Sequence, residues 1–299
     1  MTPPHCYLVF GASGFIGSHV LRELKARGQT VIGTRASSPI ENLESFDLRS
    51  DRLADLLSRC RVTPETPLIA VVCSAISQID RCFREWELSY EINVERTRTL
   101  LEDLASLGAY VVFLSTTHVF DGLSGNYDEN SPIHPLSEYG KQKAAIEDYL
   151  GSSDQESLVL RLDKIVGGDP AERHLFSEWH ELLKANRPIR CTLGQVFSPT
   201  LVDDVAKAIW LVAEKHLTGL YHVANQEAFS RTELAELFCS LAGTKAEVIT
   251  LPQADFGFAD DRPLKTNLDS RRFIDATGMQ FTPMRTVIER FLRSLSRPS

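Results

Sequence analysis

Tyr7-Leu-Val-Phe-Gly-Ala-Ser-Gly-Phe-Ile-Gly17 is an apolar run followed by three evenly spaced glycines. Residues 7–10 are typical of a buried strand, and residues 16–27 are typical of a helix that ends at Gly28. Between a strand and a helix, glycines permit a tight bend and let the backbone approach a pyrophosphate, which the helix N-terminus attracts. The segment therefore predicts a dinucleotide site made by Gly11, Ser13, Gly14, Phe15, Ile16 and Gly17. Its Gly-x-x-Gly-x-x-Gly spacing differs from the common Gly-x-Gly-x-x-Gly, and a purely structural turn is the alternative.

Strands and helices alternate after this turn. Apolar runs rich in β-branched residues predict strands at residues 30–33, 68–73, 110–114 and 158–162. Amphipathic stretches predict helices at residues 53–60, 91–107 and 138–150. This alternation predicts a Rossmann-type α/β fold, in which helices cover both faces of a doubly wound parallel sheet.

The pattern loosens beyond Val166. Helices are expected at residues 176–185, 201–214, 232–242 and 284–294, and a strand at residues 220–223. Ser230 is the expected N-cap of the third of these helices. We expect residues 1–165 to form a dinucleotide-binding Rossmann domain to which residues 197–225 return. Residues 166–196 and 226–299 are expected to form a smaller mixed α/β substrate-binding lobe.

Charge and composition favour a cytoplasmic protein that acts on small molecules. The net charge of −8 opposes binding to nucleic acid or to an anionic membrane, since both require clustered positive charge. The chain has no apolar run long enough to span a membrane, and its N-terminus does not resemble a signal peptide. The six cysteines form no Cys-x-x-Cys, and the eight histidines show no metal-binding spacing. We expect no metal ion.

Tyr139-Gly-Lys-Gln-Lys143 places a tyrosine and a lysine four residues apart. On a helix these side chains share one face, so the ammonium would stabilise a phenolate and lower the tyrosine pKa. The pair is therefore a candidate acid–base catalyst. Many surface helices carry the same spacing without any catalytic role, so the surrounding motifs must decide.

Arg35 follows the second expected strand, near the position where NAD sites carry an acidic residue. No acidic residue appears before Glu41, whereas a guanidinium suits the 2′-phosphate of NADP. Ser37 and Ser38 could add hydroxyl donors. NADP(H) is therefore the expected cofactor, with NAD(H) less favoured, although Arg35 could also be a solvated arginine.

Three motifs in this order resemble the extended short-chain dehydrogenase/reductases, and most closely the dTDP-4-dehydrorhamnose reductase branch. They are the glycine turn, Phe113-Leu-Ser-Thr-Thr-His-Val-Phe-Asp-Gly122, and Pro135-Leu-Ser-Glu-Tyr-Gly-Lys-Gln-Lys143. Residues 127–129, 198–204, 219–224 and 262–269 are similar to the same branch, so the resemblance covers nearly the whole chain. It implies NADPH-dependent reduction of a 4-keto group on a nucleotide-activated, dTDP-type deoxysugar. Family members often pair through helices beside the sheet, which makes a homodimer one expectation.

The chemistry assigns roles to three residues. Negative charge develops on the carbonyl oxygen as hydride adds to its carbon, and Thr116 can donate a hydrogen bond to that oxygen. Tyr139 can protonate the oxygen as a general acid. Ser115 is the alternative hydroxyl donor. By resemblance, Tyr139 and Lys143 also contact the cofactor, with Lys143 on the nicotinamide ribose.

Two positions depart from the family. The branch typically reads Ser-Thr-Asp-Tyr-Val-Phe, whereas this chain has Thr117 and His118 in place of the acid and the first aromatic residue. The missing acid argues against sugar-nucleotide dehydration. Because both positions border the pocket in the family, we expect Thr117 and His118 to contact substrate and to alter its identity.

Other candidates are weaker. Ala75, in the small-residue stretch after the third strand, is expected to border the cofactor, although plain packing explains it equally well. Asn93 is a poor helix former, so it either supports a helix irregularity or water near the active site, or it faces the surface. Arg262 and Arg271 could bind a substrate diphosphate, and the resemblance supports only Arg262.

Two other functions remain open. A sugar-nucleotide epimerase would use the same Tyr139 and Lys143 but would retain bound NAD. A non-catalytic regulatory subunit is the other, because the regulatory subunit of methionine adenosyltransferase resembles this branch.

Overall fold

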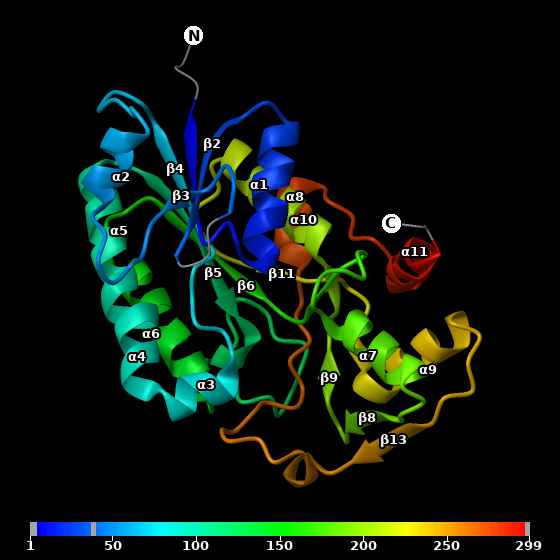
Figure 1. Cartoon of the computed structure of the whole chain (residues 1–299). Helices are drawn as coiled ribbons and strands as arrows, with labels where there is room; N and C mark the ends of the chain where they lie inside the picture. Colours follow the sequence, from blue (N-terminus) through cyan, green and yellow to red (C-terminus); the bar gives the residue numbers. More distant parts are fainter. Residues whose placement is uncertain (1–4, 37–39, 297–299) are drawn as a thin grey trace.

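A sheet of seven parallel strands forms the centre of the protein (Figure 1). The computed structural model describes residues 5–36 and 40–296, so Ser37 and Ser38 lie outside the described residues. The strand order is β3-β2-β1-β4-β5-β6-β11, with all neighbours parallel. The strands are β1 (Cys6–Phe10), β2 (Thr30–Arg35), β3 (Glu44–Ser45), β4 (Leu68–Val72), β5 (Tyr110–Thr116), β6 (Ser157–Leu162) and β11 (Gly219–Val223). This order confirms the predicted doubly wound fold, and it reverses between β1 and β4, where such sheets bind ligands.

Helices cover both faces of the sheet (Figure 1). One face carries α1 (Phe15–Ala26), α8 (Val202–Glu214) and α10 (Arg271–Thr277), and the other carries α2 (Leu53–Arg59), α5 (Thr97–Ser106) and α6 (Glu138–Ser152). Successive strand residues point to opposite faces. Tyr7 and Val9 therefore pack under α1, whereas Leu8 and Phe10 pack under α2 and α5.

A second hydrophobic core lies in a smaller lobe beside the sheet. It is built by α7 (Leu175–Lys184), α9 (Arg231–Leu241), α11 (Met284–Leu295) and the parallel pair β8 (Ile189–Thr192) and β13 (Val248–Leu251). Phe176 stacks on Phe238 with ring centroids 5.5 Å apart, and Phe291 packs against both. Helix α9 begins at the expected N-cap, where Ser230 and Glu233 form a capping box. The domain boundaries remain a prediction, and α10, within the range expected for the lobe, packs its Phe273 into the sheet core.

The short elements were not predicted. They are the helices α3 (Ile79–Arg84), α4 (Trp86–Tyr90) and α10, the 3-10 helices Thr117–Val119 and Gln253–Phe256, the strands β3, β8 and β13, and the two-residue strands β7 (Ile165–Val166), β9 (Val196–Phe197), β10 (Thr200–Leu201) and β12 (Phe229–Ser230). Elements of two or three residues are too short to display a hydrophobic period, so tertiary contacts define them.

The expected helix at residues 91–107 begins with an irregular turn. Residues Glu91–Arg96 form a π-helix that continues into α5. Asn93 lies in this turn and is buried, and its side chain binds both the N–H and the carbonyl of Ile76 at 2.8 and 2.9 Å. Of the two interpretations left open by the sequence, the structure therefore shows the helix irregularity.

Candidate active site

The glycine turn joins the carboxyl end of β1 to the N-terminus of α1. Gly11 adopts a left-handed φ of +81°, and its N–H donates to the Thr34 hydroxyl at 3.2 Å. A Cβ on Gly17 would lie 2.2 Å from the Gly11 carbonyl oxygen, so only glycine lets the helix approach the turn this closely. Ser13 and Gly14 are exposed at the tip of the turn, whereas Phe15 and Ile16 begin the helix. The first N–H groups of α1 have no intrahelical acceptor and are available to a phosphate.

The loop after β4 lies beside this turn, since a Cβ on Gly11 would lie 2.9 Å from the Cα of Ser74. Ala75 lies in this loop, and the hydroxyl of its neighbour Ser74 is buried without a hydrogen-bond partner in the described part of the chain. Asn93 fixes the loop at Ile76 and also donates to the Gln142 side chain of α6 at 2.8 Å. The loop that faces the glycine turn is thereby attached to the helix that carries Tyr139 and Lys143.

Arg35 ends β2 on the same edge of the sheet. Its side chain is partly buried, and its Nε has no acceptor within residues 5–36 and 40–296. A buried guanidinium N–H without a partner is costly. The glycine turn, the free helix N-terminus and this cation fit the phosphates of a dinucleotide.

Ser115 and Thr116 point in opposite directions from the end of β5. The Ser115 hydroxyl donates to the Glu147 carboxylate, which also pairs with the buried Arg161 at 2.6 Å. Thr116 instead lines the main cavity, and its hydroxyl accepts the His118 N–H at 3.2 Å. The geometry therefore favours Thr116 over Ser115 as the hydroxyl available to a ligand.

Helix α6 brings Tyr139 against the residues that follow β5. A Cβ on Gly140 would lie 2.1 Å from the His118 carbonyl oxygen, so the glycine allows this close contact. The His118 ring meets the Tyr139 ring edge-on, with centroids 5.9 Å apart. Thr116 lies close enough to Tyr139 to act on the pKa of its phenol, and Lys143 follows Tyr139 one helical turn later.

The ionisation of this group differs from the expectation. Burial raises the pKa of Tyr139, and the hydrogen bond with Thr116 opposes this effect. Lys143 is not among the groups that shift the pKa of this phenol. Its ammonium donates to the Leu114 carbonyl at 2.8 Å and lies over the Phe113 ring. Burial lowers the pKa of Lys143 to about 8, although Cys73 and Glu147 oppose that shift. The expected lowering of the tyrosine pKa by Lys143 is therefore not found.

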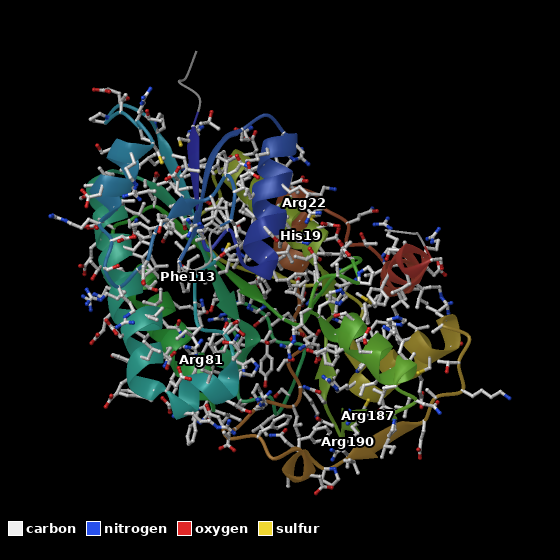
Figure 2. All side chains as sticks on the ribbon, in the orientation of Figure 1. His19, Arg22, Arg81, Phe113, Arg187 and Arg190 are labelled. Atoms are coloured by element: carbon white, nitrogen blue, oxygen red, sulfur yellow. The ribbon has the colours of Figure 1, made fainter. Side chains whose placement is uncertain are left out.

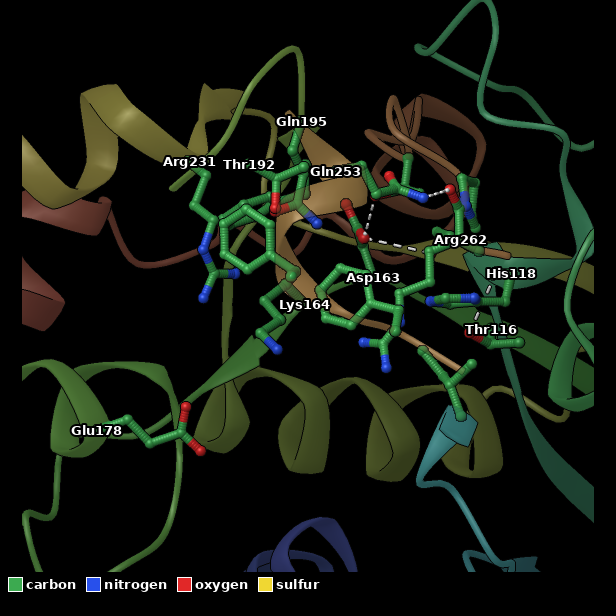
Figure 3. Close-up of a pocket in the computed structure, with 17 residues that line it drawn as sticks. Thr116, His118, Asp163, Lys164, Glu178, Thr192, Gln195, Arg231, Gln253 and Arg262 are labelled. Carbon is green, nitrogen blue, oxygen red and sulfur yellow. Dashed lines mark hydrogen bonds between the residues drawn. The ribbon is translucent and has the colours of Figure 1, made fainter. Parts of the chain in front are cut away.

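A cavity of about 340 Å³ opens between the sheet and the lobe (Figure 3). Its volume is that of a small-molecule site. Thr116, Thr117 and His118 line one end, and residues from the lobe, among them Arg231, line the other. Burial and the nearby Arg262 and Lys164 charges lower the pKa of His118 to about 3, so its imidazole is neutral at pH 7.

Arg262 reaches the cavity from the segment after the second 3-10 helix. Its guanidinium pairs with Asp80 of α3 at 2.7 Å and lies 3.8 Å over the Phe258 ring. Arg271 does not share this site. Its side chain is exposed and pairs with Asp269, so the suggestion that it binds the substrate diphosphate is not supported.

Four charged residues of the cavity were missed by sequence reasoning, and one of them is Glu178 of α7. Asp163 and Lys164 directly follow β6, and Arg231 begins α9. Figure 3 shows Lys164 and Arg231 pointing toward the same space as Arg262. Among the described residues, no carboxylate forms an ion pair with Lys164 or Arg231. Asp163 and Lys164 could have been predicted to lie near the site, because they directly follow β6 and parallel strands place their carboxyl ends at one edge of the sheet.

Asp163 lies at the centre of a hydrogen-bond network. It accepts from the Thr117 and Thr266 hydroxyls at 3.2 and 2.9 Å and from the Ser198 N–H at 2.6 Å. Burial raises the pKa of Asp163 to about 7, although these donors oppose the shift. The family usually has an acidic residue at position 117. Here Thr117 instead donates a hydrogen bond to the carboxyl group of Asp163.

Searches of the described residues for two other kinds of site found nothing. No helix within residues 5–36 and 40–296 is long and apolar enough to cross a membrane. In the same residues, no three His, Cys, Asp or Glu side chains are grouped so that they could hold a metal ion.

Comparison with known proteins identifies the family. The model described as "RmlD substrate binding domain" matches residues 6–297. The spore coat polysaccharide biosynthesis protein SpsK of Bacillus subtilis strain 168 is 28% identical over 291 residues, which are 97% of each chain. Methionine adenosyltransferase 2 subunit beta of Xenopus laevis is 27% identical over 272 residues, which are 88% of this chain and 77% of that protein.

Solved structures show the same relationship. The hypothetical dTDP-4-dehydrorhamnose reductase of Sulfolobus tokodaii is 28% identical with a TM-score of 0.81, covering 94% of this chain and 98% of its own. The dTDP-4-dehydrorhamnose reductase of Bacillus anthracis strain Ames, solved in complex with NADP, is 24% identical with a TM-score of 0.83 and covers 97% and 99%. Since the family model spans nearly the whole chain, this protein belongs to the RmlD substrate-binding domain family, and its predicted resemblance to the dTDP-4-dehydrorhamnose reductases and related enzymes is confirmed.

Proposed function

We propose that this protein reduces the 4-keto group of a nucleotide-activated, dTDP-type deoxysugar with NADPH. The observation that carries the proposal is the position of Thr116, which lines the cavity beside His118, whose ring packs edge-on against the Tyr139 ring. When bound, the nicotinamide supplies a hydride to the carbonyl carbon. The surrounding residues then manage the charge and the proton on the carbonyl oxygen.

Tyr139 is proposed as the proton donor. Because burial raises its pKa, the phenol is protonated at neutral pH and can release its proton when the carbonyl oxygen becomes negative. Thr116 is proposed to donate a hydrogen bond to that oxygen. Lys143 would hold the nicotinamide ribose and supply positive charge as the phenolate forms.

This division of roles predicts different effects at the two neighbouring hydroxyls. Thr116→Val should lower kcat/KM about 100-fold, because one donor to the developing oxyanion is lost. Ser115→Ala should leave kcat/KM within about threefold, since Ser115 bonds Glu147 away from the cavity. Steady-state kinetics of both variants decides the assignment, and a larger loss for Ser115→Ala would reverse it.

Arg35 is proposed to bind the 2′-phosphate of NADP(H). Support comes from its buried Nε, which has no acceptor among the described residues, and from the NADP in the Bacillus anthracis relative. Arg35→Ala should weaken NADPH binding about tenfold and change NADH binding less than about twofold. Fluorescence titration with both cofactors tests this, with Arg27→Ala at the other end of α1 as the control. Equal losses for both cofactors would refute the 2′-phosphate role.

The cations of the cavity support a diphosphate-bearing substrate. Lys164, Arg231 and Arg262 surround a space of nucleotide-fragment size, and two of them have a buried Nε without an acceptor in the described chain. One arginine side chain can donate two parallel hydrogen bonds to two oxygens of a phosphate. Thr117 and His118, at the end near Tyr139, are proposed to contact the sugar.

Substrate binding should depend on the ionisation of Asp163. Its pKa is raised to about 7, so it is largely neutral below that pH and a carboxylate above it. A carboxylate beside a diphosphate is repulsive, so KM should rise about threefold to tenfold from about pH 6 to about pH 8. Asp163→Asn, which cannot ionise, should flatten this profile at saturating NADPH. An unchanged KM profile in that variant would assign the pH dependence to another group.

NADPH oxidation with a panel of nucleotide 4-keto sugars tests the function itself. We expect turnover with at least one dTDP-type sugar. Stoichiometric NAD that stays bound through purification would favour a sugar-nucleotide epimerase instead. Stable association with a larger enzyme, without turnover of any keto sugar, would favour a regulatory subunit instead, and the Xenopus relative is named as a subunit of methionine adenosyltransferase 2.

A further inference from the structure

A buried histidine lies behind the glycine turn, outside the cavity. His19 belongs to α1, one turn after Phe15, and is only 4% exposed. Its Nδ1 lies 2.5 Å from a carboxylate oxygen of Asp203 in α8. Its Nε2 lies 2.7 Å from a carboxylate oxygen of Glu172, in the loop between β7 and α7. Figure 2 labels His19 and Arg22 on this helix.

This geometry requires a protonated imidazole. Each ring nitrogen faces a carboxylate, and only an imidazolium donates from both nitrogens. Burial by itself lowers the pKa of His19, but the hydrogen bonds and charges of Asp203 and Glu172 outweigh it and raise the pKa above its ordinary value. Arg22, 3.8 Å from Glu172, and Arg290, which acts on Asp203, are the other charges facing the group.

The loop held by Glu172 also contacts the glycine turn. His174 of this loop stacks on Phe15, with ring centroids 5.8 Å apart and planes inclined by 20°. Of the two histidines, His174 is not the one that carries a charge, because burial lowers its pKa. Phe15 is the first residue of α1, where the pyrophosphate of a dinucleotide would bind. Residues 167–174 therefore form a wall beside the proposed phosphate site.

We propose that His19 is a positioning residue for the cofactor. Its imidazolium binds Glu172 and thereby holds residues 167–174 against Phe15 at the phosphate-binding turn. The proposal rests on the proposed NADPH site. According to this proposal, residues 167–174 contribute to cofactor binding together with the glycine turn.

The direction of the pH effect follows from the two ion pairs. Below the His19 pKa, each carboxylate accepts a hydrogen bond from a protonated ring nitrogen, and the bond to Glu172 holds the loop in place. As pH rises through that pKa, one nitrogen becomes an acceptor facing a carboxylate, so the loop loses its attachment and NADPH should bind more weakly. By linkage, NADPH binding should raise the pKa of His19.

The test compares NADPH affinity for wild type, His19→Asn and Glu172→Gln from about pH 6 to about pH 9. At the acidic end both variants should bind about tenfold more weakly than wild type, the loss expected for one charge-assisted hydrogen bond. At the alkaline end the three proteins should converge. His216→Asn is the matched control, because His216 is an exposed histidine that pairs with Glu156 far from the turn. Dividing each curve by the control curve removes the titration of NADPH itself.

A second readout is independent of variants. In wild type, NMR titration should give a His19 pKa that rises by about one unit when NADP⁺ is added, as a tenfold coupling requires. Parallel pH curves for wild type and His19→Asn, or a His19 pKa unchanged by NADP⁺, would overturn the role of His19 while leaving the reductase proposal intact. Absence of NADPH binding to wild type at every pH would overturn both.

Discussion

Tyr139→Phe should lower kcat/KM for the keto-sugar substrate about 1000-fold while changing NADPH affinity less than about twofold. The substitution removes only the phenolic proton. The ring remains packed edge-on against His118, and the helix remains fixed through Gly140. The loss should therefore appear in the chemical step.

Tyr149→Phe provides the matched control for this prediction. Tyr149 lies on the same helix, under the guanidinium of Arg98 and far from the cavity. Its substitution should leave kcat/KM unchanged. Retention of more than about a tenth of the activity in Tyr139→Phe, with substrate affinity intact, would mean that another group donates the proton.

Gly17→Ala should abolish NADPH binding and destabilise the protein by about 3 kcal/mol or more. The added methyl would lie 2.2 Å from the Gly11 carbonyl oxygen and 2.9 Å from its carbon. Both atoms are backbone, so no side-chain rotation relieves the overlap. Helix α1 must then move away from the turn, and its free N–H groups no longer converge on a phosphate.

Gly151→Ala is the corresponding control in a helix. A Cβ at Gly151 meets nothing within 4 Å, and this glycine also lies inside a helix, α6. The substitution should leave NADPH binding unchanged and raise the free energy of unfolding by about 0.5–1 kcal/mol. Chemical denaturation and fluorescence titration of both variants provide the comparison. Normal cofactor binding by Gly17→Ala would contradict the role of this turn.

Local sequence was sufficient for the parts of the fold that have a strong period or a fixed backbone requirement. The glycine turn, the buried strands β1, β4 and β5, and the capping box of α9 all appear where residues 7–17, the apolar runs and Ser230 indicated. These features depend on neighbours close in sequence. The two-residue strands and the helices α3 and α4 depend on distant partners and were missed.

Local sequence predicts only some of the residues of the cavity. Thr116, Tyr139 and Lys143 could be found because strand ends and helix faces follow from spacing. Arg231 could not, because it reaches the cavity from the first turn of a helix in the lobe, whose placement no local pattern specifies. The error about the Tyr139 pKa has a related cause, since spacing predicts the proximity of Lys143 but not the carbonyl of Leu114 that its ammonium binds.

The most direct test of the proposed reaction follows the hydride. The enzyme would be incubated with a dTDP-type 4-keto sugar and with NADPH in which both hydrogens at C4 of the nicotinamide are deuterium. The product would then be analysed by NMR and mass spectrometry. The proposed reaction predicts one deuterium at C4 of the product sugar and the loss of one equivalent of NADPH per turnover. A product sugar without deuterium at C4, or a sugar product that forms without net oxidation of NADPH, would contradict it.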